Sequence, residues 1–117
     1  MELDEFLNKL HTHPEKMEFT ETISIIDNNY LYTPTAFQNG AQNNLAGQNE
    51  GSCKILAFAR LNKLGKEQTL HCFGKYYREE VLNDPDGEGH QNIRQFMQHD
   101  WEGVIFEKSA LKPKDKN

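Results

Sequence analysis

The residues best suited to take part in a chemical reaction are Gly51-Ser52-Cys53, which precede an apolar stretch with helical periodicity. A thiol at a helix N-terminus feels the positive end of the helix dipole, which favours the nucleophilic thiolate. A covalent mechanism also needs an imidazole base and a group that orients it. His71 or His90 could be the base, and Asn92 could orient it. The alternative is that Cys53 is a small buried residue at a tightly packed helix start.

The same run, followed by Ala57-Phe58-Ala59, is similar to the nucleophile segment of papain-type cysteine proteases. Those enzymes place their His and Asn in a long downstream half, which a chain of 117 residues does not have. A small thiol enzyme that uses Cys53 with a nearby histidine stays open as an alternative. The sequence favours a protein that acts without catalysis.

Two groups of residues could be considered as metal ligands. One is the pair His11 and His13, and the other is the acidic group of Asp84, Asp86, Glu88 and His90. The acidic group lacks the alternating ligands and the distant glutamate of a calcium loop, and no histidine or cysteine spacing is typical of zinc. The alternative is a Pro-Asp-Gly turn ahead of a helix. We therefore predict neither a metal nor a cofactor.

The segment from residue 38 to 51 is a long polar stretch with four Asn and three Gly. Asn side chains offer both donors and acceptors, and glycines let a ligand approach the backbone closely. Nearby aromatic residues could line an adjoining pocket, namely Tyr30, Tyr32, Phe37 and Trp101. The predicted ligand-binding residues are Asn39, Gly40, Asn43, Asn44, Gly47 and Asn49. The alternative is a loop that packs on the domain and satisfies its own backbone.

Apolar periodicity predicts a mainly α fold of about five helices. The expected helices cover residues 2–11, 14–26, 53–64 with Ser52 as N-cap, 66–81, and a last helix that carries Ile93, Phe96 and Met97. The third helix is apolar on most sides, which predicts a central, buried position. Residues 30–33 and 104–106 read as short extended segments that could form one two-stranded β pair.

Length and composition fit one compact domain. The chain has 117 residues, and seven Phe, four Tyr and one Trp supply bulky core material despite a hydrophobic content of 36%. We expect a single helical domain over residues 1–108 and a flexible, basic C-terminal tail over residues 109–117.

The formal net charge is −5, and no basic cluster precedes the C-terminal residues. Nucleic acid and anionic membranes both require a basic surface, so neither is an expected partner. No stretch reaches the length of a membrane span, and the acidic N-terminus differs from a secretory signal. We expect cytoplasmic synthesis and folding, with Cys53 and Cys72 as reduced, buried thiols.

Several runs together resemble the central signature of HopJ type III effector proteins, and the resemblance covers nearly the whole chain. They are Tyr32-Thr33-Pro34-Thr35-Ala36-Phe37-Gln38-Asn39-Gly40, Ala46-Gly47-Gln48-Asn49-Glu50-Gly51-Ser52-Cys53-Lys54, Cys72-Phe73-Gly74-Lys75-Tyr76-Tyr77-Arg78, Pro85-Asp86-Gly87, His90-Gln91-Asn92-Ile93-Arg94 and Phe96-Met97.

The resemblance implies a bacterial, virulence-related protein that a type III system could deliver into a host cell. It implies no catalytic residues. The expected partner is a host or bacterial protein or a small ligand, and exposed Tyr and Phe could support a homodimer. The chain departs from typical type III substrates because its first serine is Ser24 and its first residues form an acidic amphipathic helix. A resident cytoplasmic bacterial protein is therefore the alternative to an effector.

Overall fold

Helices dominate the part of the chain that the computed structural model describes, residues 2–114. The α-helices are α1 (Leu3–Thr12), α2 (Phe19–Asn29), α3 (Glu50–Leu61), α4 (Lys66–His71) and α5 (Gln91–His99). Shorter helical turns are η1 (Pro14–Lys16), the π-helical η2 (Tyr76–Val81) and η3 (Asp100–Gly103). The predicted single, mainly helical domain is confirmed.

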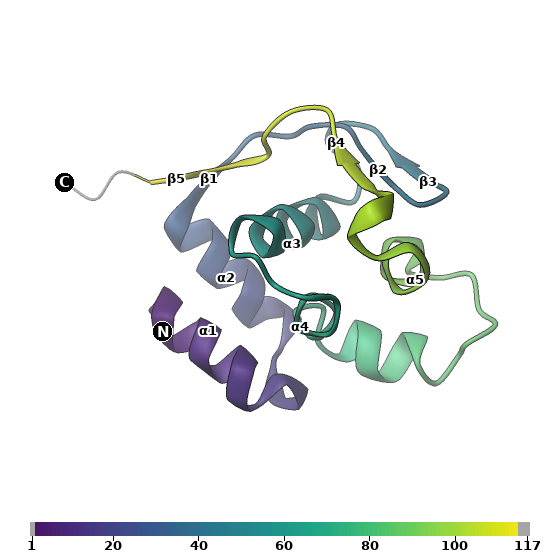
Figure 1. Cartoon of the computed structure of the whole chain (residues 1–117), viewed down its shortest axis with the longest axis horizontal. Helices are drawn as coiled ribbons and strands as arrows, with labels where there is room; N and C mark the ends of the chain where they lie inside the picture. Colours follow the sequence, from purple (N-terminus) through teal and green to yellow (C-terminus); the bar gives the residue numbers. More distant parts are fainter. Residues whose placement is uncertain (1, 115–117) are drawn as a thin grey trace.

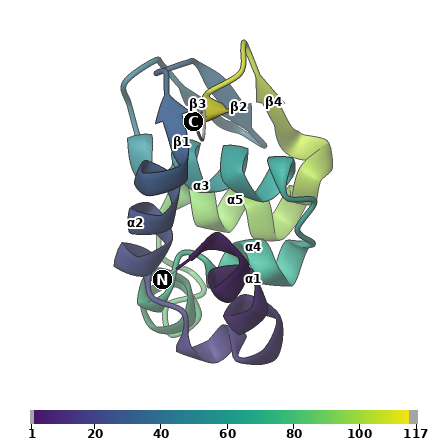
Figure 2. The ribbon, with the colours of Figure 1, turned by 90° about the vertical axis from the view of Figure 1, so that its left-hand side faces the viewer.

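The described residues include five short strands, which lie together along one edge, with the helices on the other side (Figure 1; Figure 2). They are β1 (Tyr30–Tyr32), β2 (Phe37–Asn39), β3 (Gln42–Asn44), β4 (Val104–Phe106) and β5 (Leu111–Pro113). β2 pairs with β3 and β4 in one antiparallel sheet, and β1 pairs with β5 in a second. The expected pairing of residues 30–33 with 104–106 is therefore wrong.

The partner of β4 is β2, which begins at Phe37 and whose last two residues belong to the polar segment that the sequence predicts to be a loop. Phe37 lies opposite Phe106 in the register, and their rings stack with centroids 5.3 Å apart. This aromatic pair gives β2 an apolar anchor, although the rest of the hairpin is polar. Cross-strand pairs of this kind stabilise short strands that have weak intrinsic preference for the sheet.

The C-terminal residues up to Lys114 form ordered structure. Ala110 and Leu111 are each only 3% exposed, and β5 pairs with β1 from Leu111 opposite Tyr32 to Pro113 opposite Tyr30. The flexible tail expected from residue 109 is therefore wrong for residues 109–114, because two apolar side chains anchor them. The last three expected tail residues, 115–117, lie outside the described part of the chain.

The predicted fourth helix is interrupted. α4 ends at His71, and Gly74 adopts φ +63° before the π-helical η2 begins. A Cβ atom on Gly74 would lie 2.7 Å from the backbone nitrogen of Phe19, so glycine permits this close contact. The break carries Tyr76 against the ring of Phe19, with centroids 5.1 Å apart. A continuous helix would not have this contact.

α3 is the central, buried helix that its apolar sequence predicts. Phe58 is fully buried and packs edge-on against Phe6 and Tyr30, with ring centroids 5.7 and 5.9 Å away. The helix begins at Glu50, three residues earlier than the sequence indicates, and its N-cap is Asn49. Within residues 2–114, the helices are too short or too polar to cross a membrane.

Candidate functional site

A buried network of asparagines joins the β2–β3 hairpin to α5. Asn44 Nδ2 donates to Asn92 Oδ1 at 3.1 Å, and Asn92 Nδ2 donates back to Asn44 Oδ1 at 3.0 Å. Asn39 Nδ2 donates to the Asn92 carbonyl oxygen at 2.7 Å, and Asn49 Nδ2 donates to Asn44 Oδ1 at 2.7 Å. Asn39 and Asn44 are buried, so the network holds the hairpin in a single position.

Two of the predicted ligand-binding residues, Asn39 and Asn44, therefore have their donors engaged inside the protein. Gly40 forms the hairpin turn with φ +58°, and a Cβ atom there would collide with the side chains of Gln95 and His99. Asn43 and Gly47 are exposed. Asn39, Gly40 and Asn44 thus fit the alternative in which the segment packs on the domain. The ligand-binding role of the six residues stays a prediction.

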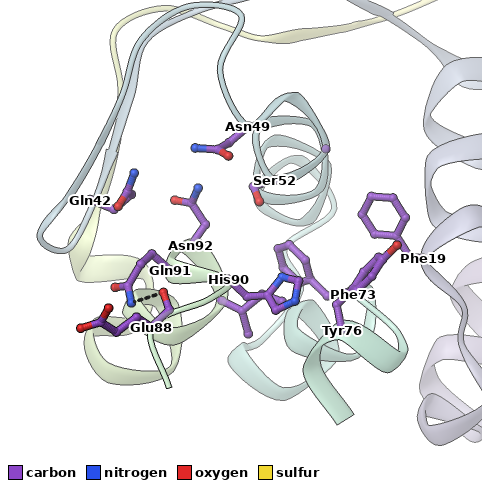
Figure 3. A pocket seen from close by; sticks show the side chains of 12 residues that line it. Phe19, Gln42, Asn49, Ser52, Phe73, Tyr76, Glu88, His90, Gln91 and Asn92 are labelled. Atoms are coloured by element: carbon purple, nitrogen blue, oxygen red, sulfur yellow. Dashed lines mark hydrogen bonds between the residues drawn. The ribbon is translucent and has the colours of Figure 1, made fainter. Parts of the chain in front are cut away.

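The candidate site is an open cleft of about 450 Å³ between the hairpin, the first turns of α3 and α5, and η2 (Figure 3). Of the six predicted ligand-binding residues, Asn49 lines this cleft. We call it the α3–α5 cleft. Its lining is Phe19, Gln42, Asn49, Gly51, Ser52, Phe73, Tyr76, Glu88, His90, Gln91, Asn92 and Ile93. The volume falls within the roughly 300–1,000 Å³ typical of small-molecule sites.

One wall of the cleft is made of neutral polar side chains. Gln42 comes from β3, Asn49 and Ser52 come from the start of α3, and Gln91 comes from the start of α5. Figure 3 shows Gln42 beside the hairpin, Asn49 and Ser52 at α3, and Gln91 near Glu88. Gln91 Nε2 donates to the Glu88 carbonyl oxygen at 2.8 Å, and its amide oxygen accepts a hydrogen bond from Gln95 Nε2 at 3.3 Å. Together they provide both donors and acceptors.

The opposite wall is aromatic. The ring of Tyr76 packs edge-on against Phe19 and lies 5.3 Å from the ring of His90 at an angle of 35° (Figure 3). Phe73 is 2% exposed and supports these rings from below the surface. The partly exposed faces of Tyr76 and His90 can therefore receive a flat ligand surface.

The charged groups at the cleft are few. His90 Nε2 lies 3.0 Å from Glu80 Oε1, and Glu88 is exposed at the rim. The described residues that line the cleft include neither lysine nor arginine. The described lining therefore offers no lysine or arginine to balance a strongly anionic ligand.

The first turns of α3 and α5 also face this cleft. Their N-caps, Asn49 and His90, both have left-handed backbone geometry with φ +49° and +57°, and neither side chain caps its own helix. The first N–H groups of a helix have no partner within the helix. Gly51, Ser52, Gln91 and Asn92 carry such groups where the lining places them. These groups add hydrogen-bond donors to the polar wall.

Cys53 lies in the first turn of α3 as predicted, but its side chain points into the core. It is 1% exposed and lies against the Tyr32 side chain and the Thr35 backbone. Burial raises the pKa of the Cys53 thiol, although those two contacts act in the opposite direction. A thiol kept protonated in this way is a poor nucleophile.

The two candidate bases have other neighbours. Nδ1 of His71 accepts a 3.3 Å hydrogen bond from Arg78 Nη1, and the His71 ring packs edge-on against Tyr77. His90 contacts Tyr76 and Glu80. Burial, with a smaller contribution from the Arg78 charge, lowers the pKa of His71. Among the hydrogen bonds of residues 2–114, none joins Cys53 to either histidine.

Neither cysteine forms a disulfide, and burial raises the pKa of the Cys72 thiol to about 12. Within the described chain, no cluster of three or more His, Cys, Asp or Glu side chains has the geometry to hold a metal ion. In the acidic turn, the Asp84 carbonyl oxygen accepts a 2.7 Å hydrogen bond from Arg94 Nη1. That contact gives the turn a role in holding the start of α5.

Sequence reasoning missed most of the cleft. Gln42, Ser52 and Gln91 are scattered polar residues, and Phe19 and Tyr76 look like ordinary core positions in a helical pattern. The usable signal is the pair of helix starts at Glu50 and Gln91, because each directly follows a residue, Asn49 or His90, of a type that tolerates left-handed geometry. Nothing in the linear sequence indicates that the two starts meet.

These features define a small helical domain with a preformed polar and aromatic cleft. The chain belongs to the HopJ type III effector protein family, whose model matches residues 3–111. A solved structure, the crystal structure of the unknown function protein VPA0580, is 55% identical and superposes with a TM-score of 0.96. The match covers 97% of this chain and 95% of that one. Among proteins with curated functions, none matches.

Replacing Asn92 with alanine tests the asparagine network. Asn44 would lose both side-chain hydrogen bonds to Asn92, and Asn39 would lose its 3.1 Å bond to Asn92 Oδ1 while keeping the one to the backbone carbonyl. We therefore expect the free energy of unfolding to fall by about 1–3 kcal/mol. Asn43→Ala, an exposed change on the same hairpin, should stay within about 0.5 kcal/mol of the parent. Urea unfolding measures both. Equal, small effects in the two variants would mean that the network contributes little.

Alkylation tests the state of Cys53. Iodoacetamide at pH 8 should leave Cys53 and Cys72 unmodified in the folded protein and modify both in urea, where thiols titrate near the ordinary value of about 8.5. Peptide mass spectrometry reports each site, and N-acetylcysteine serves as the free-thiol control. If folded Cys53 reacts as fast as the control, the thiol-enzyme alternative is favoured.

Proposed function

We propose that this HopJ-family chain acts by binding a small molecule in the α3–α5 cleft. The observation that carries the proposal is the division of one cleft into an amide and hydroxyl wall and an aromatic wall. Binding sites for small molecules combine apolar surface with a few placed polar groups in this way. A ligand with a flat apolar face and a polar edge would match both walls.

The fixed position of the polar wall supports this function. Asn49 donates to Asn44, and Asn44 pairs with Asn92, so three elements that contribute to the cleft are hydrogen-bonded to one another. The Ala41 backbone N–H donates to Gln95 Oε1 at 2.9 Å, which adds a further link between the hairpin and α5. A preorganised site loses less conformational entropy when a ligand binds.

The surroundings of Cys53 favour binding over thiol chemistry. The thiol is buried on the core side of α3, whereas Ser52 of the same turn lines the cleft. A ligand in the cleft would therefore meet the Ser52 hydroxyl and the first N–H groups of α3 before it met a nucleophile. This arrangement suits recognition of the ligand without a covalent step.

The test is an NMR titration of ¹⁵N-labelled protein with a panel of neutral sugars, nucleosides, aromatic carboxylates and amino acids. We expect at least one class to shift the amide signals of Ser52, His90 and Gln91 while the signals of α1 stay unchanged. If no class shifts the cleft signals, or if the shifts fall elsewhere, the proposal is wrong. Shifts caused only by a protein partner would replace it with protein binding.

A matched pair of glycine variants tests whether the ligand binds in the α3–α5 cleft. A Cβ atom on Gly51 would lie 2.9 Å from the end of the Phe19 ring, so Gly51→Ala displaces that ring from the cleft wall. Gly89→Ala adds the same atom where nothing lies within 4 Å. We expect binding of the ligand found in the titration to weaken about two- to tenfold in Gly51→Ala only. Equal affinities in the two variants would place the ligand elsewhere.

We also propose, from family membership alone, that a type III system delivers the protein into host cells. A fusion of the chain to a calmodulin-dependent adenylate cyclase should raise cyclic AMP in host cells only when the bacterium has an intact apparatus. The rise should disappear when residues 1–12 are replaced by an unrelated sequence. If an intact apparatus gives no rise, the protein is resident in the bacterium.

A further inference from the structure

We infer that the ligand of the α3–α5 cleft is a neutral carbohydrate, a mono- or disaccharide. The inference rests on the proposed function, because it names the chemistry of the molecule that this cleft would bind. Three properties of the cleft carry it: the type of its polar groups, the sign of its charges, and the one-sided arrangement of its rings.

The polar wall matches hydroxyl groups. Each sugar hydroxyl is one donor and an acceptor, and a side-chain amide offers both a carbonyl acceptor and an NH₂ donor. Gln42 and Asn49 are such amides, and Ser52 adds a hydroxyl of its own. The Gln91 amide already bonds to the Glu88 carbonyl oxygen and to Gln95 Nε2, so it contributes less. Helix-start N–H groups beside Ser52 and Gln91 can donate to further sugar oxygens. A ligand with hydroxyls around a ring would use this wall more fully than one with a single polar group.

The charged side chains of the cleft oppose phosphate-bearing ligands, whereas the two helix starts alone would favour an anion. Glu88 lies at the rim, and the one imidazole, His90, is already paired with Glu80 at 3.0 Å. Specific recognition of phosphate usually relies on Arg or Lys, and the lining described here contains neither. A carboxylate such as that of Glu88 accepts hydrogen bonds from hydroxyls, and it repels a phosphate. These charged side chains favour a neutral, hydroxylated ligand over a nucleotide.

The rings form a platform on one side only. The rings of Tyr76 and His90 are tilted by 35° to each other with centroids 5.3 Å apart, while the amides of Gln42 and Asn49 lie on the other side of the cleft (Figure 3). A nucleobase presents two π-faces, and one would lie against polar side chains. A sugar ring can instead place its C–H face on the aromatic platform and direct its hydroxyls at the amides, because aromatic faces attract partly positive hydrogens. The geometry thus favours a sugar over a nucleoside.

The deciding experiment compares probes on the ¹⁵N-labelled full chain. The sugars are methyl β-D-glucopyranoside, D-galactose, N-acetyl-D-glucosamine, maltose and cellobiose; adenosine, uridine, benzoate and inorganic phosphate are the comparison probes. We expect saturable shifts at Ser52, His90 and Gln91 from at least one sugar, and weaker or no shifts there from the comparison probes.

The outcomes separate the two proposals. If adenosine, uridine, benzoate or phosphate saturates the cleft signals and no sugar does, the carbohydrate inference is overturned and the binding function stands. If no probe and no other class in the broader panel shifts the cleft, both fail.

Two variants of Tyr76 test the platform. Tyr76→Phe keeps the ring and should keep the affinity for the sugar within about twofold, whereas Tyr76→Leu removes the platform and should weaken binding about two- to tenfold. The amide signals of α1 serve as the check that both variants fold, since α1 lies away from the cleft lining. Equal affinities of the two variants would overturn stacking on Tyr76 and, with it, the inference.

Discussion

The reciprocal amide pair between Asn44 and Asn92 is the constraint on which the candidate site depends. It joins a three-residue strand, too short to be stable alone, to the first turn of α5. Both residues are buried, so each amide would cost free energy if it lost its partner. The pair therefore fixes the hairpin against the helix, and the hairpin in turn carries Gln42 to the cleft.

The cleft also depends on departures from regular backbone geometry. The left-handed conformations of Asn49 and His90 start two helices at the same place, and Gly74 ends the α4 region so that η2 can turn Tyr76 towards Phe19. Left-handed and π-helical residues often occur at functional sites, where packing or hydrogen bonding compensates for the strain. In this chain three such departures surround a single cleft.

Cys53 and Ser52 lie in the same helical turn but have different roles, because Cys53 packs in the core and Ser52 lines the cleft. Both residues belong to the first turn of α3, but Cys53 is buried, and burial raises the pKa of its thiol despite its contacts with Tyr32 and Thr35. Ser52 faces the cleft and keeps a hydroxyl available. The residue that looks most reactive in the sequence thus supports the core, while neutral amides, a hydroxyl and aromatic rings form the accessible surface. A binding role follows more directly from that surface than a covalent reaction.

The sequence by itself determined the family, the mainly helical class and the central position of α3, because apolar periodicity and the HopJ motif runs are local features. It also pointed to the Asn and Gly segment, yet it could not say that Asn39 and Asn44 face inward while Asn49 faces the cleft. The tertiary structure decided which of these asparagines face inward. It also decided the pairing of β4 with β2, the burial of Leu111 and the meeting of the two helix starts. Each depends on contacts between residues far apart in the chain, and linear spacing carries no information about such contacts.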